Sequence, residues 1–329
     1  MRLVFAGNPA IAVPSLKAAA ENGRVAAALT NPDSVRGRGG REEPGDVAKA
    51  AAGLGIPVLK FDTLRAEARE AVAALRPDLL VSFAYGRIFG PRFLALFPWG
   101  GINIHPSLLP KYRGPSPLQE AIFRRDTLSG VTIQRLAPGM DEGDLLCRRE
   151  IPLTGRETTA VLGEKAAVAG AELLAELLVR LDREGAAALE GRPQEGEPSY
   201  CTLLDRSRGI IDWNKSAAEI DAQIRACIPW PLARTAHNGK TIIIWEANIY
   251  AGKAESINGI IPDAGKAAAH GPVPGQVLGK DREFGILIQT GDGVLAVSCL
   301  QYQTKKALPW QAFLNGAGDL IGSCLSGGI

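Results

Sequence analysis

The chain has 329 residues, of which 46% are hydrophobic and 22% charged, a composition typical of a soluble globular protein with two domains. The formal net charge is only +2, so a nucleic-acid partner would need a local basic patch rather than the whole surface. The five cysteines form no Cys-x-x-Cys pair, which indicates reduced thiols in a cytoplasmic protein. The first apolar run breaks at Gly7-Asn8-Pro9, too early for a secretory leader, and no stretch is long and apolar enough to span a membrane.

The first third of the chain predicts alternating strands and helices. The expected segments are a strand at 2–6, a helix at 14–22, and then a strand at 25–30, a helix at 46–53, a strand at 56–60, a helix at 63–75 and a strand at 78–84. Strand–helix–strand repeats of this kind favour a parallel sheet. The first turn has one glycine and lacks Gly-x-Gly-x-x-Gly, so the sequence gives little support for a dinucleotide site.

A glycine-rich segment interrupts this alternation at 34–41. Its sequence, Ser-Val-Arg-Gly-Arg-Gly-Gly-Arg, predicts a mobile loop that carries Arg36, Arg38 and Arg41. Composition alone favours a solvated linker. The alternative is a flexible arm that contacts phosphate, although Glu42 and Glu43 follow at once and reduce its positive charge.

The stretch at 101–117 is the most informative part of the chain. It opens as a strand that presents two isoleucines to one face and Asn103 and His105 to the other, because strand side chains alternate. Pro106 and Pro110 then end regular pairing and force an ordered loop. Ligands bind at the carboxyl ends of strands in open α/β sheets, so we expect the amide and the imidazole to face a pocket.

A second polar cluster, Met140-Asp141-Glu142-Gly143-Asp144, follows further along the chain. An amide, an imidazole and a carboxylate suffice for general acid–base chemistry with oxyanion stabilisation. Simpler interpretations are an imidazole that bonds only to backbone and a carboxylate that only closes a turn. His105, Asp141 and Asp144 do not match a known ligand spacing, so no metal site is predicted. The other histidines, His237 in a turn and His270 in a low-complexity segment, are expected at the surface.

The remaining segments predict the end of one domain and the whole of another. We expect a helix near 116–125, strands at 131–136 and 145–152, a long helix at 158–181, a helix at 216–227 and short strands at 241–245, 276–278, 286–289 and 294–300. The sequence therefore predicts an α/β domain with a mostly parallel, Rossmann-like sheet over 1–183, a linker over 184–202 and a smaller OB-like β-barrel over 203–329. Residues 251–274, rich in Gly, Ala and Pro, are expected to be a surface insertion.

Several motifs together resemble the methionyl-tRNA formyltransferase family. They include Phe5-Ala-Gly-Asn-Pro, Asn103-Ile-His-Pro-Ser-Leu-Leu-Pro, Met140-Asp-Glu-Gly-Asp, Ile211-Asp-Trp and Arg225-Ala-Cys-Ile-Pro-Trp-Pro. The resemblance covers nearly the whole chain except 251–274. It implies the formyltransferase fold with a C-terminal tRNA-binding domain. It also implies transfer of a formyl group from 10-formyltetrahydrofolate to the α-amino group of methionyl initiator tRNA, which yields N-formylmethionyl-tRNA for translation initiation.

The same resemblance implies roles for individual residues. The catalytic set would be Asn103, His105 and Asp141. The folate would be bordered by Phe83, Ala84, Tyr85, Gly86, Ser107, Leu108, Leu109 and Pro110. The tRNA would be contacted by the loop arginines Arg36, Arg38 and Arg41, and neither a metal, a membrane nor an obligate protein partner is implied.

Two questions stay open from the sequence. Either His105 or Asp141 could accept the proton of the attacking amine, because an imidazole titrates near neutrality and a carboxylate can stabilise its cation. The reaction itself has alternatives, namely formylation of an amino sugar, hydrolysis of the formyl-folate, or RNA binding by an inactive transferase domain. The small β-rich second domain and the intact polar set favour formylation of tRNA.

Overall fold

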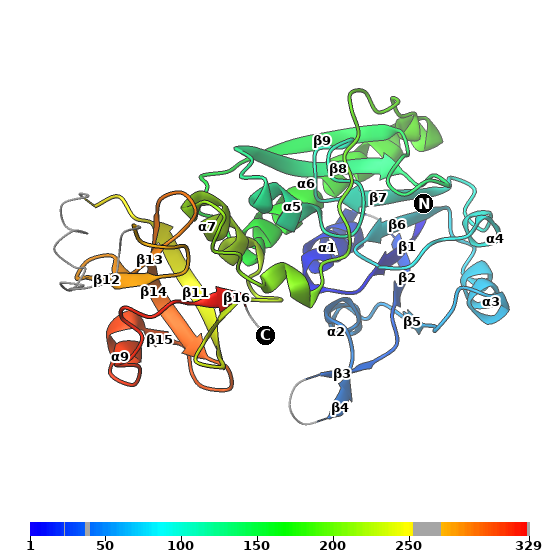
Figure 1. Cartoon of the computed structure of the whole chain (residues 1–329). Helices are drawn as coiled ribbons and strands as arrows, with labels where there is room; N and C mark the ends of the chain where they lie inside the picture. The colour runs from blue at the N-terminus through cyan, green and yellow to red at the C-terminus, as the bar shows by residue number, and fades with distance from the viewer. Residues whose placement is uncertain (23, 37–39, 253–270, 328–329) are drawn as a thin grey trace. The chain divides into compact units, whose positions relative to one another are not determined.

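The computed structural model describes residues 1–22, 24–36, 40–252 and 271–327, which form two compact units (Figure 1). The first unit comprises Met1–Leu118, Thr127–Leu153 and Val161–Leu203; the second comprises Gln119–Asp126, Thr154–Ala160 and Leu204–Ile329. The stretch 184–202, expected as a linker, thus groups with the first unit. Within the described ranges, no helix has the length and apolar character to cross a membrane.

The first unit is built on a seven-stranded sheet in the order β5-β2-β1-β6-β7-β8-β9. Its strands are β1 (Arg2–Gly7), β2 (Arg24–Thr30), β5 (Val58–Lys60), β6 (Leu79–Phe83), β7 (Gly101–His105), β8 (Leu128–Arg135) and β9 (Leu145–Pro152). The pairs from β5 to β7 are parallel, whereas β8 and β9 add as an antiparallel edge. The predicted mostly parallel, Rossmann-like sheet is confirmed, and β7 lies inside it with a partner on each side.

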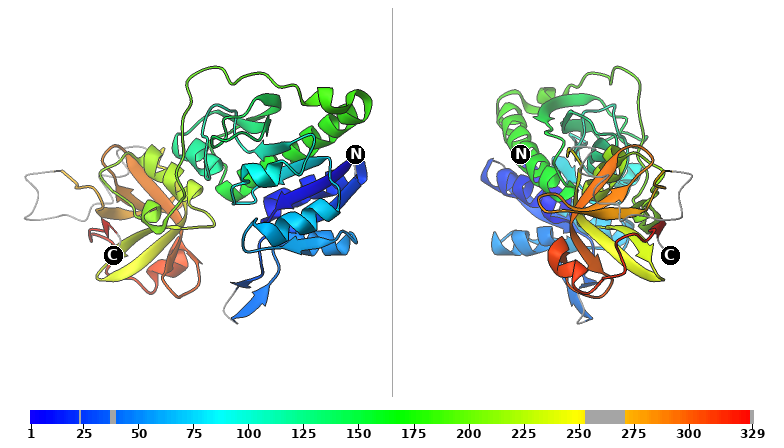
Figure 2. Two further views of the ribbon diagram at one scale, coloured as in Figure 1. Left: turned by 90° about the vertical axis from the view of Figure 1, so that its right-hand side faces the viewer. Right: turned by 60° about the vertical axis from the view of Figure 1, so that its left-hand side comes forward.

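Helices cover both faces of this sheet (Figure 2). They are η1 (Ala10–Ala12), α1 (Val13–Asn22), α2 (Asp46–Gly53), α3 (Ala66–Ala74), α4 (Pro91–Leu94), α6 (Thr159–Glu184) and η2 (Gly185–Leu189), with the start of α5 (Pro117–Phe123). On one face Val4 and Leu80 pack against Phe93 in a buried apolar cluster. On the other, Gly170 of α6 lies so close to Ile104 of β7 that an added Cβ would be 3.1 Å from its side chain. Burial on both faces explains the almost continuous apolar runs in the central strands.

Two short strands flank residues 37–39 of the arginine-rich segment, and the mobile loop expected there lies outside the described residues. Ser34–Arg36 (β3) pairs antiparallel with Arg41–Glu43 (β4), and Arg36 lies opposite Arg41 in the register. Each strand has only three residues, too few for period-two alternation to reveal them in the sequence. Arg38 lies outside the described residues.

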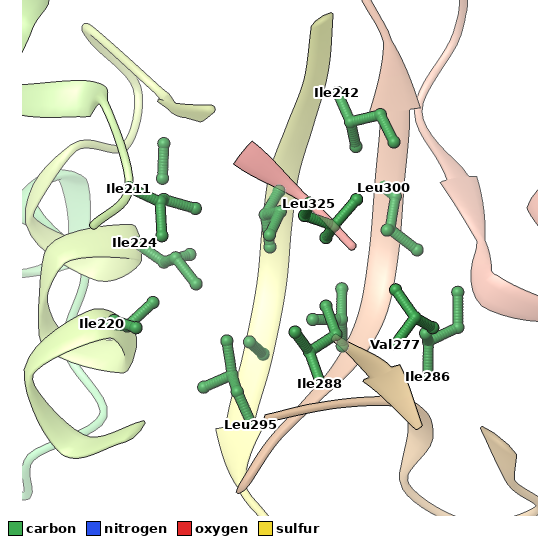
Figure 3. Packing of buried hydrophobic residues seen from close by; sticks show 14 of the residues in the cluster. Ile211, Ile220, Ile224, Ile242, Val277, Ile286, Ile288, Leu295, Leu300 and Leu325 are labelled. Carbon is green, nitrogen blue, oxygen red and sulfur yellow. The ribbon is translucent and has the colours of Figure 1, made fainter. Parts of the chain in front are cut away.

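The second unit contains an antiparallel sheet in the order β12-β13-β14-β11-β10-β16, with β15 paired to β14. The elements are η3 (Arg206–Gly209), α7 (Ala217–Ala226), β10 (Ala233–His237), β11 (Lys240–Ile249), β12 (Val277–Asp281), β13 (Gly285–Gln289), β14 (Val294–Tyr302), β15 (Leu308–Pro309), α9 (Trp310–Leu314) and β16 (Ser326–Gly327). The sheet curls around buried aliphatic side chains, among them Ile242, Ile288 and Leu295 (Figure 3). The predicted OB-like architecture is confirmed, whereas most of the insertion at 251–274 lies outside the described residues.

One sequence-based expectation in this unit is wrong. His237 was expected at the surface because it precedes the turn Asn238-Gly239, yet only 3% of it is exposed. It ends β10, whose sequence Ala-Arg-Thr-Ala-His carries few strand-favouring side chains and was not predicted as a strand. Pairing on both sides, with β11 and β16, places β10 inside the sheet and buries its last residue.

Candidate active site

The register between β7 and β8 assembles a polar layer at the carboxyl end of β7. Asn103 lies directly opposite Gln134, and His105 lies opposite Thr132. All four side chains share one face of the sheet because successive residues alternate between faces. Thr132, Gln134 and His105 are each less than 5% exposed, so their polar atoms need partners within the protein.

Asp141 completes this layer from the loop between β8 and β9. Its Oδ1 accepts hydrogen bonds from Gln134 Nε2 at 2.8 Å and from Asn103 Nδ2 at 3.4 Å. Its Oδ2 accepts one from the backbone N–H of Gly114 at 2.8 Å and lies 3.5 Å from His105 Nδ1. The structure therefore brings together the three residues expected to be catalytic.

The bonding of His105 indicates which of its nitrogens is available. Nε2 lies 2.9 Å from the carbonyl oxygen of Tyr112, and a carbonyl can only accept, so Nε2 carries the proton. In the neutral ring Nδ1 then has its lone pair on the side of Asp141. Burial lowers the pKa of His105 below its ordinary 6.5, and the Asp141 carboxylate and the Tyr112 carbonyl only partly oppose this. The imidazole is thus a neutral base at neutral pH.

Two glycines allow the loops around Asp141 to approach closely. Gly114 has φ +114° and lies against the carbonyl oxygen of Cys201, where a Cβ would collide. A Cβ at Gly143 would collide with the carbonyl oxygen of Arg135. The glycine in Met140-Asp-Glu-Gly-Asp is therefore required for packing, and the backbone N–H of Gly114 reaches the carboxylate.

The residues expected to border folate lie in two segments that follow neighbouring strands. One segment leaves β6 at Phe83, and the other leaves β7, its parallel neighbour. Within the first, Ala84 and Gly86 are exposed and have positive φ, whereas Phe83 and Tyr85 are buried. The two aromatic rings of this turn are therefore buried, and its exposed positions are Ala84 and Gly86.

The second segment, residues 107–110, also combines buried and partly exposed residues. Ser107 and Leu109 are buried, whereas Leu108 and Pro110 are half-buried. Ser107 Oγ donates to the carbonyl of Lys111 at 2.6 Å, and Thr132 Oγ1 donates to the carbonyl of Ser107 at 2.7 Å. The buried members thus fix the loop, and Leu108 and Pro110 are the side chains that a ligand could contact.

The loop arginines are placed less completely. The backbones of Arg36 and Arg41 lie opposite each other in the β3–β4 hairpin. Arg38 is outside the described residues. Among the described residues, no group of three or more His, Cys, Asp and Glu side chains could hold a metal ion.

Sequence reasoning missed three residues that contact this site. Gln134 could have been found, because alternation within Gly130-Val-Thr-Ile-Gln places Thr132 and Gln134 on one strand face. Arg113 and Gln194 gave no comparable signal, since one lies in an irregular loop and the other in a segment without periodicity. Gln194 Nε2 nevertheless donates to the carbonyl of Asp141 at 2.8 Å, and Arg113 Nη2 donates to Gln194 Oε1 at 2.8 Å.

Comparison with known proteins identifies similar chains. A family model described as formyl transferase matches residues 1–178, and one described as formyl transferase, C-terminal domain, matches residues 203–318. A methionyl-tRNA formyltransferase of Treponema denticola is 43% identical over 98% of both chains.

Solved structures of the same fold are more distant in sequence. A methionyl-tRNA formyltransferase from Clostridium thermocellum has a TM-score of 0.55 and 18% identity, covering 77% of this chain and 95% of its own. HypX from Aquifex aeolicus in complex with tetrahydrofolic acid has a TM-score of 0.59 and 18% identity. That comparison covers 98% of this chain but only 48% of HypX, so this chain spans about half of HypX.

Proposed function

The chain belongs to the methionyl-tRNA formyltransferase family, and from this premise we propose that it formylates the α-amino group of methionyl initiator tRNA. The donor in this proposal is 10-formyltetrahydrofolate, and the product, N-formylmethionyl-tRNA, serves translation initiation. The observation that carries the proposal is the convergence of Asn103, His105 and Asp141 at the carboxyl end of β7. These three side chains supply an oxyanion donor, a neutral base and a carboxylate within one polar layer.

The chemistry follows from these groups. The neutral amine attacks the formyl carbon, and a carbon–nitrogen bond forms while negative charge gathers on the formyl oxygen. In this proposal Asn103 donates an N–H to that oxygen, a contact worth roughly 10²–10³-fold in comparable oxyanion sites. Donors fixed in advance by the surrounding protein need no reorganisation when the charge develops.

Proton transfer completes the reaction. The amine gives up one proton to the His105–Asp141 pair, whose free atom on the imidazole is Nδ1. The bond between the formyl carbon and N10 of the folate then breaks, and N10 takes up a proton, leaving tetrahydrofolate. A base within hydrogen-bond reach contributes about 10²–10⁴-fold to such steps.

Substrate binding is divided between the two parts of the chain in this proposal. Residues 1–183 hold the reaction, and the folate lies along 83–86 and 107–110, where exposed backbone and the side chains of Leu108 and Pro110 can contact it. Residues 203–329 contribute a platform for the tRNA, and the arginines of the 34–41 segment, Arg36, Arg38 and Arg41, contact its phosphates. The separate family matches, to 1–178 and 203–318, support this division.

A substrate comparison tests the proposal. The full chain is incubated with 10-formyltetrahydrofolate and, in parallel, with charged initiator tRNA, free methionine or an amino-sugar nucleotide, and formylated product is measured by mass spectrometry. We expect product from the charged tRNA alone. Preferential formylation of the sugar nucleotide, or loss of the formyl group to water in all three reactions, would overturn it.

A further inference from the structure

Residues 190–201, which we call the strap, run along the active-site loops of the first unit. At one end the backbone of Arg192 pairs with Leu145, with N···O distances of 2.7 and 3.0 Å. At the other, Ser199 accepts from the backbone N–H of Arg113 at 2.8 Å, and Cys201 donates to the carbonyl of Arg113 at 2.8 Å. The strap is therefore fixed on both sides of the loops that surround Asp141.

Gln194 lies between these attachments and bonds to the loop of Asp141. Its Nε2 donates to the carbonyl of Asp141 at 2.8 Å and to that of Gly143 at 2.9 Å. Its Oε1 accepts from Arg113 Nη2 at 2.8 Å and from Arg113 Nε at 3.2 Å. A side-chain amide has two N–H donors and one oxygen with two lone pairs, so these four bonds satisfy both ends of the amide, and a longer contact of 3.4 Å joins Nε2 to Gln134 Oε1.

The backbone of Asp141 explains why its loop needs such support. Asp141 has φ +55°, in the left-handed region that costs free energy for residues other than glycine. The carbonyls of Asp141 and Gly143 converge on one amide group in this conformation. The same conformation directs the Asp141 carboxylate towards Gly114, Gln134 and His105.

Arg113 connects Gln194 to the opposite side of the carboxylate. Its guanidinium also donates to Tyr200 Oη at 2.9 Å and to Glu142 Oε1 at 3.2 Å. Its neighbour in the chain, Gly114, donates the backbone hydrogen bond to Asp141 Oδ2. The Arg113–Gln194 pair thus links the two loops between which the carboxylate is held.

We propose that Gln194 is a positioning residue for formyl transfer, which holds Asp141 against His105 by fixing its loop without contacting either substrate. The inference rests on the proposed function for its kinetic readout. A misplacement of about 1 Å can cost on the order of 10²-fold in rate. Loss of this amide should therefore lower kcat and leave substrate binding nearly unchanged.

Three variants separate the hydrogen bonds from packing. Gln194→Met keeps the length of the side chain and removes the hydrogen bonds, Gln194→Ala removes both, and Glu195→Ala is the control on an exposed neighbour in the strap. We expect Gln194→Met and Gln194→Ala to lower kcat by about 10–100-fold. KM for tRNA and for folate should stay within about twofold, and Glu195→Ala should match the wild type.

A second readout does not depend on activity. Nuclear magnetic resonance of the imidazole of His105, identified by its loss in His105→Asn, reports the pKa of that ring. Asp141 is the charged side chain that faces Nδ1, and it raises this pKa, while the Tyr112 carbonyl faces Nε2. Displacement of Asp141 in Gln194→Met should therefore lower the pKa of His105 further, whereas general destabilisation would change the melting temperature alone.

The possible results are distinct. A wild-type rate and an unchanged His105 titration in Gln194→Met would overturn the inference, even if Gln194→Ala were inactive or unfolded, because packing would then explain everything. A wild-type chain that forms no formylated tRNA would instead contradict the proposed function. In that case the His105 titration still decides whether Gln194 positions Asp141.

Discussion

Two histidines of this chain are equally buried, and they differ in what surrounds them. His105 is 4% exposed and His237 is 3% exposed. His105 bonds through Nε2 to a carbonyl and faces a carboxylate through Nδ1. His237 Nε2 has no hydrogen-bond partner among the residues that the structure describes. Burial alone therefore does not distinguish the two imidazoles, whereas the partners on their ring nitrogens do.

The regions around His105 and His237 also differ in the kind of side chain that they bury. The end of β7 holds a polar layer in which the Asp141 carboxylate accepts a hydrogen bond from the Asn103 amide and lies 3.5 Å from the His105 imidazole. The second unit instead buries a continuous aliphatic core around residues such as Ile242 and Leu295 (Figure 3). Substitutions in the polar layer should change the rate, and substitutions in the core should change stability.

The largest expected effect comes from the polar layer. Asn103→Ala and Asp141→Ala should each lower kcat by roughly 10²–10⁴-fold, since each removes an oxyanion donor or an acid–base partner. Steady-state formylation and thermal unfolding measure the two consequences. His237→Ala is the matched control, and it should change the melting temperature without changing kcat. A similar loss of kcat in all three variants would erase the proposed distinction between the two regions.

The core should respond almost as strongly, but in stability. Ile242→Ala removes a fully buried side chain of β11, which costs about 2–5 kcal/mol in the free energy of unfolding. Ile249→Ala, in the same strand but with a side chain 51% exposed, is the control. Urea unfolding of the full chain measures both. Equal destabilisation by the two changes would show that burial does not decide their effect.

A helix cap in the second unit should contribute less. Ser216 precedes α7 and forms a reciprocal capping box with Glu219, in which each side chain bonds to the other's backbone. Ser216→Ala should destabilise the chain by about 0.5–2 kcal/mol, whereas Ser216→Asp can still cap and should stay close to the wild type. Urea midpoints compare them. If the aspartate is as harmful as the alanine, the hydroxyl is needed for some other contact.

The smallest effect is expected at an exposed ion pair of the first unit. Arg149 of β9 bonds to Glu176 of α6 at 2.6 Å, but the Glu176 side chain is 64% exposed. Exposed pairs of this kind contribute about 0.2–1 kcal/mol, because solvent screens them. Glu176→Gln should therefore lower stability by less than about 1 kcal/mol, and about 1 M salt should remove the difference. A larger, salt-resistant loss would indicate a buried role for Glu176.

The sequence predicted the regular parts of the molecule because their side chains are periodic. Apolar runs located the central strands, and helical spacing located α6 within a few residues of its observed bounds, Thr159–Glu184. Short or irregular elements escaped it. The β3–β4 hairpin has too few residues to alternate, and β10 has a composition that does not favour strands.

The candidate site also contains residues that the sequence pattern predicts and residues whose position only the folded chain shows. Asn103 and His105 could be predicted as neighbours because residues two apart in a strand share a face. The position of Asp141 depends on the β7–β8 register and on a left-handed backbone, which tertiary contacts fix. Gln194 is distant in sequence and lies in an aperiodic stretch, so only the folded chain shows its contact with the Asp141 loop.

The pH dependence of a single turnover tests the central claim, that His105 in its polar layer serves formyl transfer. Rapid-quench formylation of prebound methionyl-tRNA is followed from about pH 5 to 9. The bound amine must be neutral, and its ordinary pKa of about 7.7–8.0 gives one limb. Because burial lowers the pKa of His105, its protonation should add a second, steeper fall below pH 6.5. His105→Ala should be about 10²–10⁴-fold slower and should lack that second fall. A variant that keeps both the wild-type rate and the acidic limb would contradict the account.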